Sequence, residues 1–137
     1  MKQIKIILFF CVTVFSSQYL SAQKIRIKDN IAYVDDKPYL KVSDCGMYKE
    51  DCSISNLDGK LIISIDKLPN QAKPGTYLQI VFKGLNTTIE LNTNMSRIVK
   101  ILYTNNAVDK EGNLIAENVK LIAAKYTRAY SLKEDED

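Results

Sequence analysis

The sequence lacks histidine and tryptophan, and it holds only three cysteines, three prolines and five glycines among 137 residues. Without histidine the chain cannot form the Ser-His or Cys-His pairs that activate most nucleophiles, and a catalytic zinc ion loses its usual ligand. The sequence also lacks a Gly-x-Ser-x-Gly elbow and a phosphate-binding glycine loop. These absences exclude the commonest hydrolase and nucleotide-binding chemistries, although an enzyme without histidine could still use paired carboxylates.

The chain also has no large excess of positive or negative charge. The formal net charge of the chain is +3, and residues 23–133 hold 17 basic and 12 acidic side chains, whereas residues 134–137 are all acidic. A nucleic-acid-binding protein presents a dense basic stripe, which this modest surplus does not provide. We therefore expect no nucleic-acid partner and no cofactor, and a solvated, disordered acidic tail.

The N-terminus reads as a secretory signal peptide. Lys2 and Lys5 precede an apolar run over residues 6–15. A more polar stretch follows and ends in the small residues Ser21 and Ala22, which form a plausible cleavage site. This run is about half of the ~20 residues that a membrane-spanning helix needs. Cys11 lies inside the run and not at its end, so no lipid anchor is expected. The sequence predicts cleavage after Ala22 and a periplasmic or extracellular protein without a transmembrane segment.

Two cysteines remain after this cleavage, Cys45 and Cys52, in a chain bound for an oxidising compartment. Their spacing differs from the Cys-x-x-Cys of redox centres, and the absence of histidine makes a zinc site unfavourable. A disulfide across this loop would stabilise the fold by roughly 2.5 kcal/mol on the loop-entropy estimate. The sequence predicts this disulfide, with two free thiols or a metal site as the alternatives.

Strand-like patterns fill the region between residues 24 and 91. Asp29-Asn30, the segment Asp35–Pro38 and the Asp58-Gly59 pair predict turns, and short connections between strands indicate antiparallel neighbours. We expect short strands at residues 24–28, 31–34, 39–42, 53–55, 61–65, 76–82 and 87–91.

The apolar spacing becomes helical near residue 93. Met95, Ile98 and Leu102 lie on one helical face, with Thr93 or Asn94 as the N-cap, and a second amphipathic face runs from Ile115 to Tyr126. The sequence predicts an α+β fold: an antiparallel meander of about six or seven short strands followed by two C-terminal helices packed on one face. Residues 23–133 would form this single domain, between the signal peptide (1–22) and the tail (134–137).

The loop between the two cysteines is the expected contact surface, because a crosslinked loop on a rigid scaffold is preorganised for binding. Met47 and Tyr48 lie at its centre and are the candidate binding residues. Its acidic residues Asp44, Glu50 and Asp51 could offer oxygens to Ca²⁺, but they lack the regular spacing of a calcium loop, so we predict no metal site.

Two further groups of side chains are candidates for function. The adjacent carboxylates Asp35 and Asp36 lie in a predicted turn, where solvated acids are common. Tyr33, Tyr39 and Tyr77 lie on predicted strands and would form a binding platform if they shared a face. We expect the acids to be solvated and the tyrosines to pack in or beside the core.

The turn from Ser55 to Lys60 (Ser-x-x-Asp-Gly-Lys) and the segment from Ile98 to Tyr103 resemble small exported proteins of unknown function from Gram-negative bacteria. This resemblance implies export and supplies no site and no activity.

The leading hypothesis for function is a non-enzymatic envelope protein that binds a protein, peptide or glycan through its sheet face or the loop at residues 45–52. The alternatives are a small carboxylate-based hydrolase acting on envelope polymer, and association with a membrane surface through the basic body.

Overall fold

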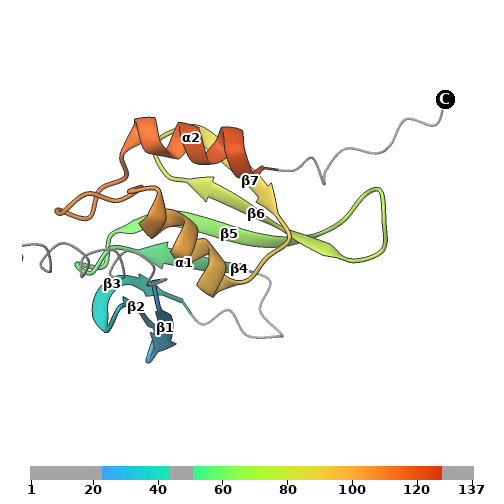
Figure 1. The fold of residues 1–137 in the computed structure, drawn as a ribbon. Coiled ribbons are helices and arrows are strands. Elements are labelled where there is room, and N and C mark those ends of the chain that lie inside the picture. Colours follow the sequence, from blue (N-terminus) through green and yellow to red (C-terminus); the bar gives the residue numbers. More distant parts are fainter. Residues whose placement is uncertain (1–22, 44–50, 128–137) are drawn as a thin grey trace, which may run out of the picture.

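The computed structural model describes residues 23–43 and 51–127, which form seven strands and two helices (Figure 1). The strands are β1 (Ile25–Lys28), β2 (Ile31–Val34), β3 (Lys37–Val42), β4 (Asp51–Ser55), β5 (Leu61–Pro69), β6 (Thr76–Phe82) and β7 (Thr87–Leu91). The helices are α1 (Met95–Thr104) and α2 (Ala116–Tyr126).

The strands form one sheet in the order β1-β2-β3-β4-β5-β6-β7, and each is antiparallel to its neighbour. Every connection joins sequence neighbours, so the sheet is a meander. The predicted α+β fold, with strands first and two helices last, is confirmed.

Two very short turns connect β1 to β2 and β2 to β3. Asp29 and Asn30 have φ values of 52° and 64°, and Asp35 and Asp36 have values of 50° and 67°. Two consecutive positive φ values indicate the two-residue turn that matches strand twist. The second turn is shorter than predicted, because Lys37 already belongs to β3.

Pro38 was expected in that turn but lies inside β3, where a missing N–H would normally break the sheet. It is tolerated because β3 pairs with β4 only at its far end, through Lys41 with Ser55 and Val42 with Ile54. The first half of β3 therefore behaves as a sheet edge on that side.

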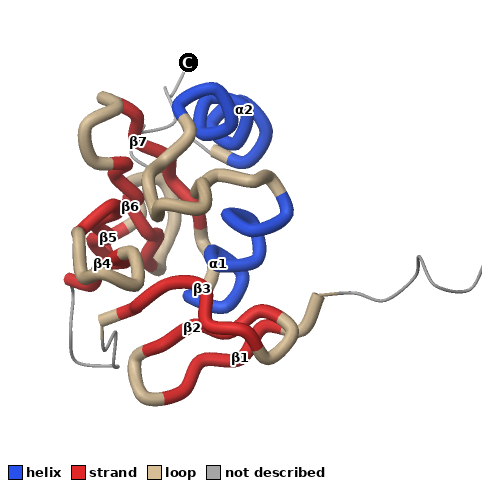
Figure 2. The backbone as a smooth tube through the Cα atoms, turned by 90° about the vertical axis from the view of Figure 1, so that its left-hand side faces the viewer, coloured by secondary structure: helices blue, strands red, loops and turns tan. Residues whose placement is uncertain are grey.

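The short β3–β4 junction divides the sheet into two parts, β1–β3 and β4–β7. Figure 2 shows these parts meeting at an angle, with α1 on the inner side of the corner. Helix α1 contacts β1 and β2, and α2 contacts β7 at the other end of the sheet. The helices thus fill the concave side of the curved sheet.

The core consists mainly of aliphatic side chains from the strands and from one face of each helix. Asn94 caps α1 as predicted, because its side-chain oxygen accepts a hydrogen bond from the Arg97 N–H. The buried residues are Ala32, Val34, Leu40, Val42, Ile54, Ile62, Ile63, Ile65, Ile80, Phe82, Ile89, Ile98, Val99, Ile101, Leu102, Ala107, Val119 and Ile122.

The outer edge of β7 is held by the residue that follows α2, because the Glu90 N–H donates to Thr127 Oγ at 3.0 Å. Neither helix of residues 23–43 and 51–127 is long and apolar enough to cross a membrane.

Candidate functional site

A β-bulge in β3 changes the direction of one tyrosine. Tyr33 pairs with Pro38 and Ala32 pairs with Leu40, so Tyr39 is an extra residue without an opposite partner in β2. A bulge can re-aim a side chain that strict alternation would send to the other face. Tyr39 accordingly packs beside the core and meets Tyr103 of α1 edge-to-face, with ring centroids 5.2 Å apart and planes at 84°.

The turn between β4 and β5 is organised by the side chain of Asn56, the single buried polar residue among the described positions. Its Oδ1 accepts hydrogen bonds from the N–H groups of Asp58 at 3.1 Å and Lys60 at 2.9 Å. The Gly59 N–H donates to the Asn56 carbonyl at 2.9 Å, with Gly59 at φ +90°. The predicted Asp-Gly hairpin is present, but only its glycine has a positive φ.

The connection between α1 and α2 contains a second turn of the same design. Asp109 Oδ1 accepts hydrogen bonds from the N–H groups of Glu111 at 3.0 Å and Asn113 at 2.9 Å. The Gly112 N–H donates to the Asp109 carbonyl at 3.0 Å, with Gly112 at φ +85°. Residues 56–60 and 109–113 thus share one pattern: Asn or Asp, any residue, an acid, glycine and a polar residue. We call them the twin turns.

The twin turns contact each other directly. Asn56 Nδ2 donates to the Gly112 carbonyl at 3.1 Å, and Lys60 Nζ donates to Asn113 Oδ1 at 3.3 Å. A Cβ atom added to Gly112 would lie 2.7 Å from Asn56 Cβ, so only glycine permits this approach. One buried amide therefore closes its own turn and joins it to the other.

The second turn is also fixed to the helices on either side. The Ile115 N–H donates to the carbonyl of the fully buried Ala107 at 2.8 Å, and Asn118 Nδ2 donates to the Asn106 carbonyl at 2.8 Å. Val108 and Leu114 form an isolated bridge between these anchors. The turn is consequently held in place by α1, by α2 and by the other twin turn.

A cleft of about 460 Å³ lies where β3 separates from β4, and the twin turns form its other walls. We call it the turn cleft. It is lined by Pro38, Tyr39, residues 56–58 and residues 108–112. This volume is within the range of pockets that bind small molecules.

The lining of the turn cleft combines apolar surface with acids. Leu57, which is 42% exposed, and Val108 join Tyr39 to form the apolar part. Asp58 and Glu111 come from the same third position of the twin turns, and both are exposed. The cleft lining therefore presents both apolar and acidic side chains, with Lys110 as its one basic residue.

The residues that sequence analysis singled out are mostly elsewhere. Cys45, Met47, Tyr48, Asp44 and Glu50 lie outside the described residues, as do the predicted signal peptide (1–22) and acidic tail (134–137).

Of the loop at residues 45–52, the structure describes only the last two residues, with which β4 begins. Cys52 lies in β4 opposite Ile65 and is half-buried, and the backbone of Asp51 pairs with Asp66. No group of three His, Cys, Asp or Glu side chains that could hold a metal ion occurs within residues 23–43 and 51–127. The disulfide and the loop surface stay predictions.

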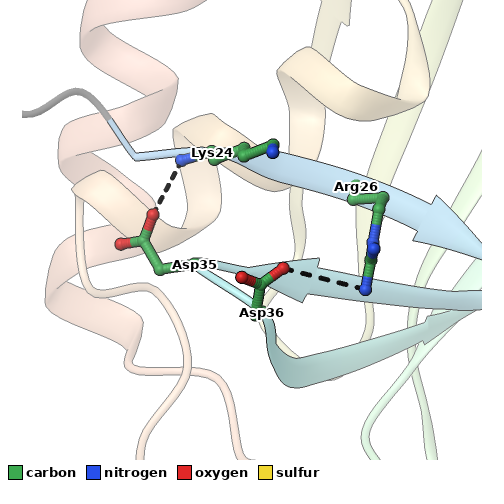
Figure 3. A network of polar contacts seen from close by, with 4 residues as sticks. All are labelled: Lys24, Arg26, Asp35 and Asp36. Atoms are coloured by element: carbon green, nitrogen blue, oxygen red, sulfur yellow. Dashed lines mark hydrogen bonds and ion pairs between the residues drawn. The ribbon is translucent and has the colours of Figure 1, made fainter.

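The adjacent carboxylates Asp35 and Asp36 point to two different partners, one just before β1 and one within it (Figure 3). Asp35 Oδ1 accepts a hydrogen bond from the Lys24 N–H at 2.9 Å, and Asp36 Oδ1 lies 3.7 Å from Arg26 Nη2. The Arg26 and Asp36 side chains are 52% and 74% exposed, so this ion pair contributes little to stability. The two acids therefore connect the β2–β3 turn to Lys24 and to Arg26 of β1.

The three strand tyrosines do not form a common platform, and Tyr77 of β6 is buried, with 4% of its surface exposed. The bulge turns Tyr39 to the helix side, whereas Tyr33 alternates with the buried Ala32 and Val34 and contacts Arg26 on the opposite side, 5.2 Å from its ring centroid. Core packing describes Tyr39 better than a shared binding surface does.

A comparison with known proteins finds no matching family model, no matching curated protein and no matching solved structure. The geometry of the chain itself is therefore the basis for assigning a role.

The contact between the twin turns can be tested with Asn56→Asp. This change keeps an oxygen acceptor for Asp58 and Lys60, but it replaces the amide that donates to Gly112 with an oxygen that repels the carbonyl. We expect the free energy of unfolding to fall by about 2 kcal/mol, measured by urea denaturation. The matched control, Asp58→Asn, changes an exposed side chain of the same turn and should alter it by less than about 0.5 kcal/mol. Equal stabilities would contradict the role of the buried amide.

The environment of Tyr39 predicts a pH effect. Burial, with a smaller contribution from Tyr103, raises the pKa of the Tyr39 phenol to about 12 from 10.0. The unfolded chain releases this proton first, so the free energy of unfolding should decline as pH rises from 10 to 12. Tyr39→Phe removes this contribution, and its stability should fall less steeply over that window in denaturant titrations. Parallel pH profiles for the two proteins would refute it.

Proposed function

We propose that the chain is an exported, non-enzymatic binding protein of the bacterial envelope that captures an extended segment of a partner protein in the turn cleft. The observation that carries this proposal is the cleft itself: a hollow of about 460 Å³ with an apolar wall and exposed acids, built from turns that are hydrogen-bonded to each other. Such concave sites with a few polar groups are the usual places of recognition.

The fixed walls of the cleft support binding as its role. Asn56 is 5% exposed and all of its side-chain hydrogen bonds are internal, so the cleft holds its shape without a ligand. A preformed site loses little conformational entropy when a partner binds. Met47 and Tyr48, which lie outside the described residues, stay the second candidate for partner contact, on the sequence argument alone.

The alternative, a carboxylate-based hydrolase acting on envelope polymer, is favoured by one feature: three acids line the cleft. Asp109 is the weakest candidate, because its Oδ1 already accepts two backbone hydrogen bonds. Asp58 and Glu111 remain as a possible acid–base pair. Release of soluble fragments from purified envelope polymer, lost in Asp58→Asn and in Glu111→Gln, would favour the enzyme over the binding protein.

The binding proposal predicts where a partner touches the protein. A photo-crosslinking residue at position 57, inside the cleft, should capture a defined partner segment in the native cell, and the same residue at position 121 should not. Leu121 is the matched control because it is 64% exposed on α2, outside the cleft lining. With the captured segment, Leu57→Ala should weaken binding about tenfold, and Leu121→Ala should leave it unchanged. Identical adducts from both positions would refute the cleft as the binding site.

The predicted export is tested by the intact mass of the protein purified from its native cell. We expect a chain that begins at Gln23 and is lighter by two hydrogens than its reduced form, because Cys45 and Cys52 are paired. A product that still begins at Met1 would contradict export, and a mass unchanged by reduction would contradict the disulfide.

A further inference from the structure

The two exposed acids of the turn cleft occupy equivalent places. Asp58 and Glu111 are the third residues of the twin turns, and one comes from each wall. Neither acid forms an ion pair with a basic side chain of residues 23–43 and 51–127, whereas Asp36 pairs with Arg26. The cleft therefore offers two carboxylates to a ligand.

The apolar part of the cleft lining suits a long aliphatic stem. Tyr39 and Val108 both pack against the core and also line the cleft, so they supply a fixed surface of ring and methyl groups. The Tyr39 ring is further held by its edge-to-face contact with Tyr103. Lysine and arginine side chains bury their methylene groups on such surfaces while their charges reach a polar rim.

The net charge of the whole domain further limits which kind of ligand fits the cleft. Residues 23–133 carry 17 basic and 12 acidic side chains, so the net positive charge of the domain disfavours a strongly basic partner. The cleft lining has the opposite balance, with three acids and one base, Lys110. A single positive side chain within a neutral or acidic segment satisfies both conditions.

From this cleft and its charge we infer that the turn cleft takes one lysine or arginine side chain of the partner segment. The inference rests on the proposed binding function and adds the chemistry of the ligand. The methylene stem lies on Tyr39 and Val108, and the charge is shared by Asp58 and Glu111. Because these carboxylates are exposed, the charge contribution weakens as ionic strength rises.

The test is a titration of the isotope-labelled mature protein with end-capped five-residue peptides of glycine and serine that differ only in the central residue. The central residue is lysine, arginine, norleucine or glutamate, and binding is followed at the amide signals of Gly59 and Gly112. We expect the lysine and arginine peptides to bind about three- to tenfold tighter than the norleucine peptide, and the glutamate peptide to bind weakest. This preference should shrink in high salt.

Charge-neutralising variants distinguish recognition of the positive charge from non-specific apolar binding. In Asp58→Asn and Glu111→Gln the preference for lysine over norleucine should fall toward one, while norleucine binding stays as it was. Glu117→Gln is the matched control, because it removes the same charge from an exposed position on α2 outside the cleft. It should leave the preference intact.

The possible failures can be told apart. Equal binding of all four peptides, or a preference that survives in both cleft variants, overturns the assignment of a basic side chain and leaves a cleft-binding protein. If no peptide moves the two glycine signals while position 57 still crosslinks to a partner, the cleft recognises different chemistry, and this inference is again overturned. If position 57 also captures nothing, the proposed function fails together with it.

Discussion

The geometry at this end of the molecule depends on one buried amide. Asn56 accepts two hydrogen bonds that close its own turn. It donates a third to the carbonyl of Gly112, which lies 56 positions further along the chain. A buried amide that lost these partners would cost about 1–3 kcal/mol, so the side chain strongly favours the arrangement in which both turns are in place. The position of a hairpin in the sheet and that of a helix connection are thereby linked.

The sheet creates the space that this amide encloses. Because β3 and β4 share only two residue pairs, the first half of β3 diverges from the sheet, and the bulge directs Tyr39 toward the helices. A fully paired β3 would fill the gap with neighbouring backbone, and a regular β3 would place the ring on the other face. The cleft results from these two departures from regular strand geometry and from the turns that bridge them.

The sequence predicted the elements well because their signals are local. Alternation in β6 and β7 and helical spacing in α1 and α2 are set by which side chains each element buries, and Asn94 marks the start of α1. The candidate site was missed because it depends on pairing between distant residues. The bulge at Tyr39 exists only once β2 and β3 are in register, and Asn56 reveals its role only beside Gly112. One signal was available: the five-residue pattern at 56–60 recurs at 109–113.

That recurrence also explains how a small domain can offer a stable and specific surface. In both twin turns the first side chain and the glycine form the turn's hydrogen bonds, whereas the carboxylate of the acid at the third position takes part in none of them. Its backbone is fixed by its own N–H, but its carboxylate remains directed to solvent at the cleft. In the proposed function, the structural role and the recognition of the ligand therefore belong to different residues of one motif. A change of the acid should alter what the cleft binds and leave the scaffold standing, whereas a change of the first residue or the glycine should disturb both.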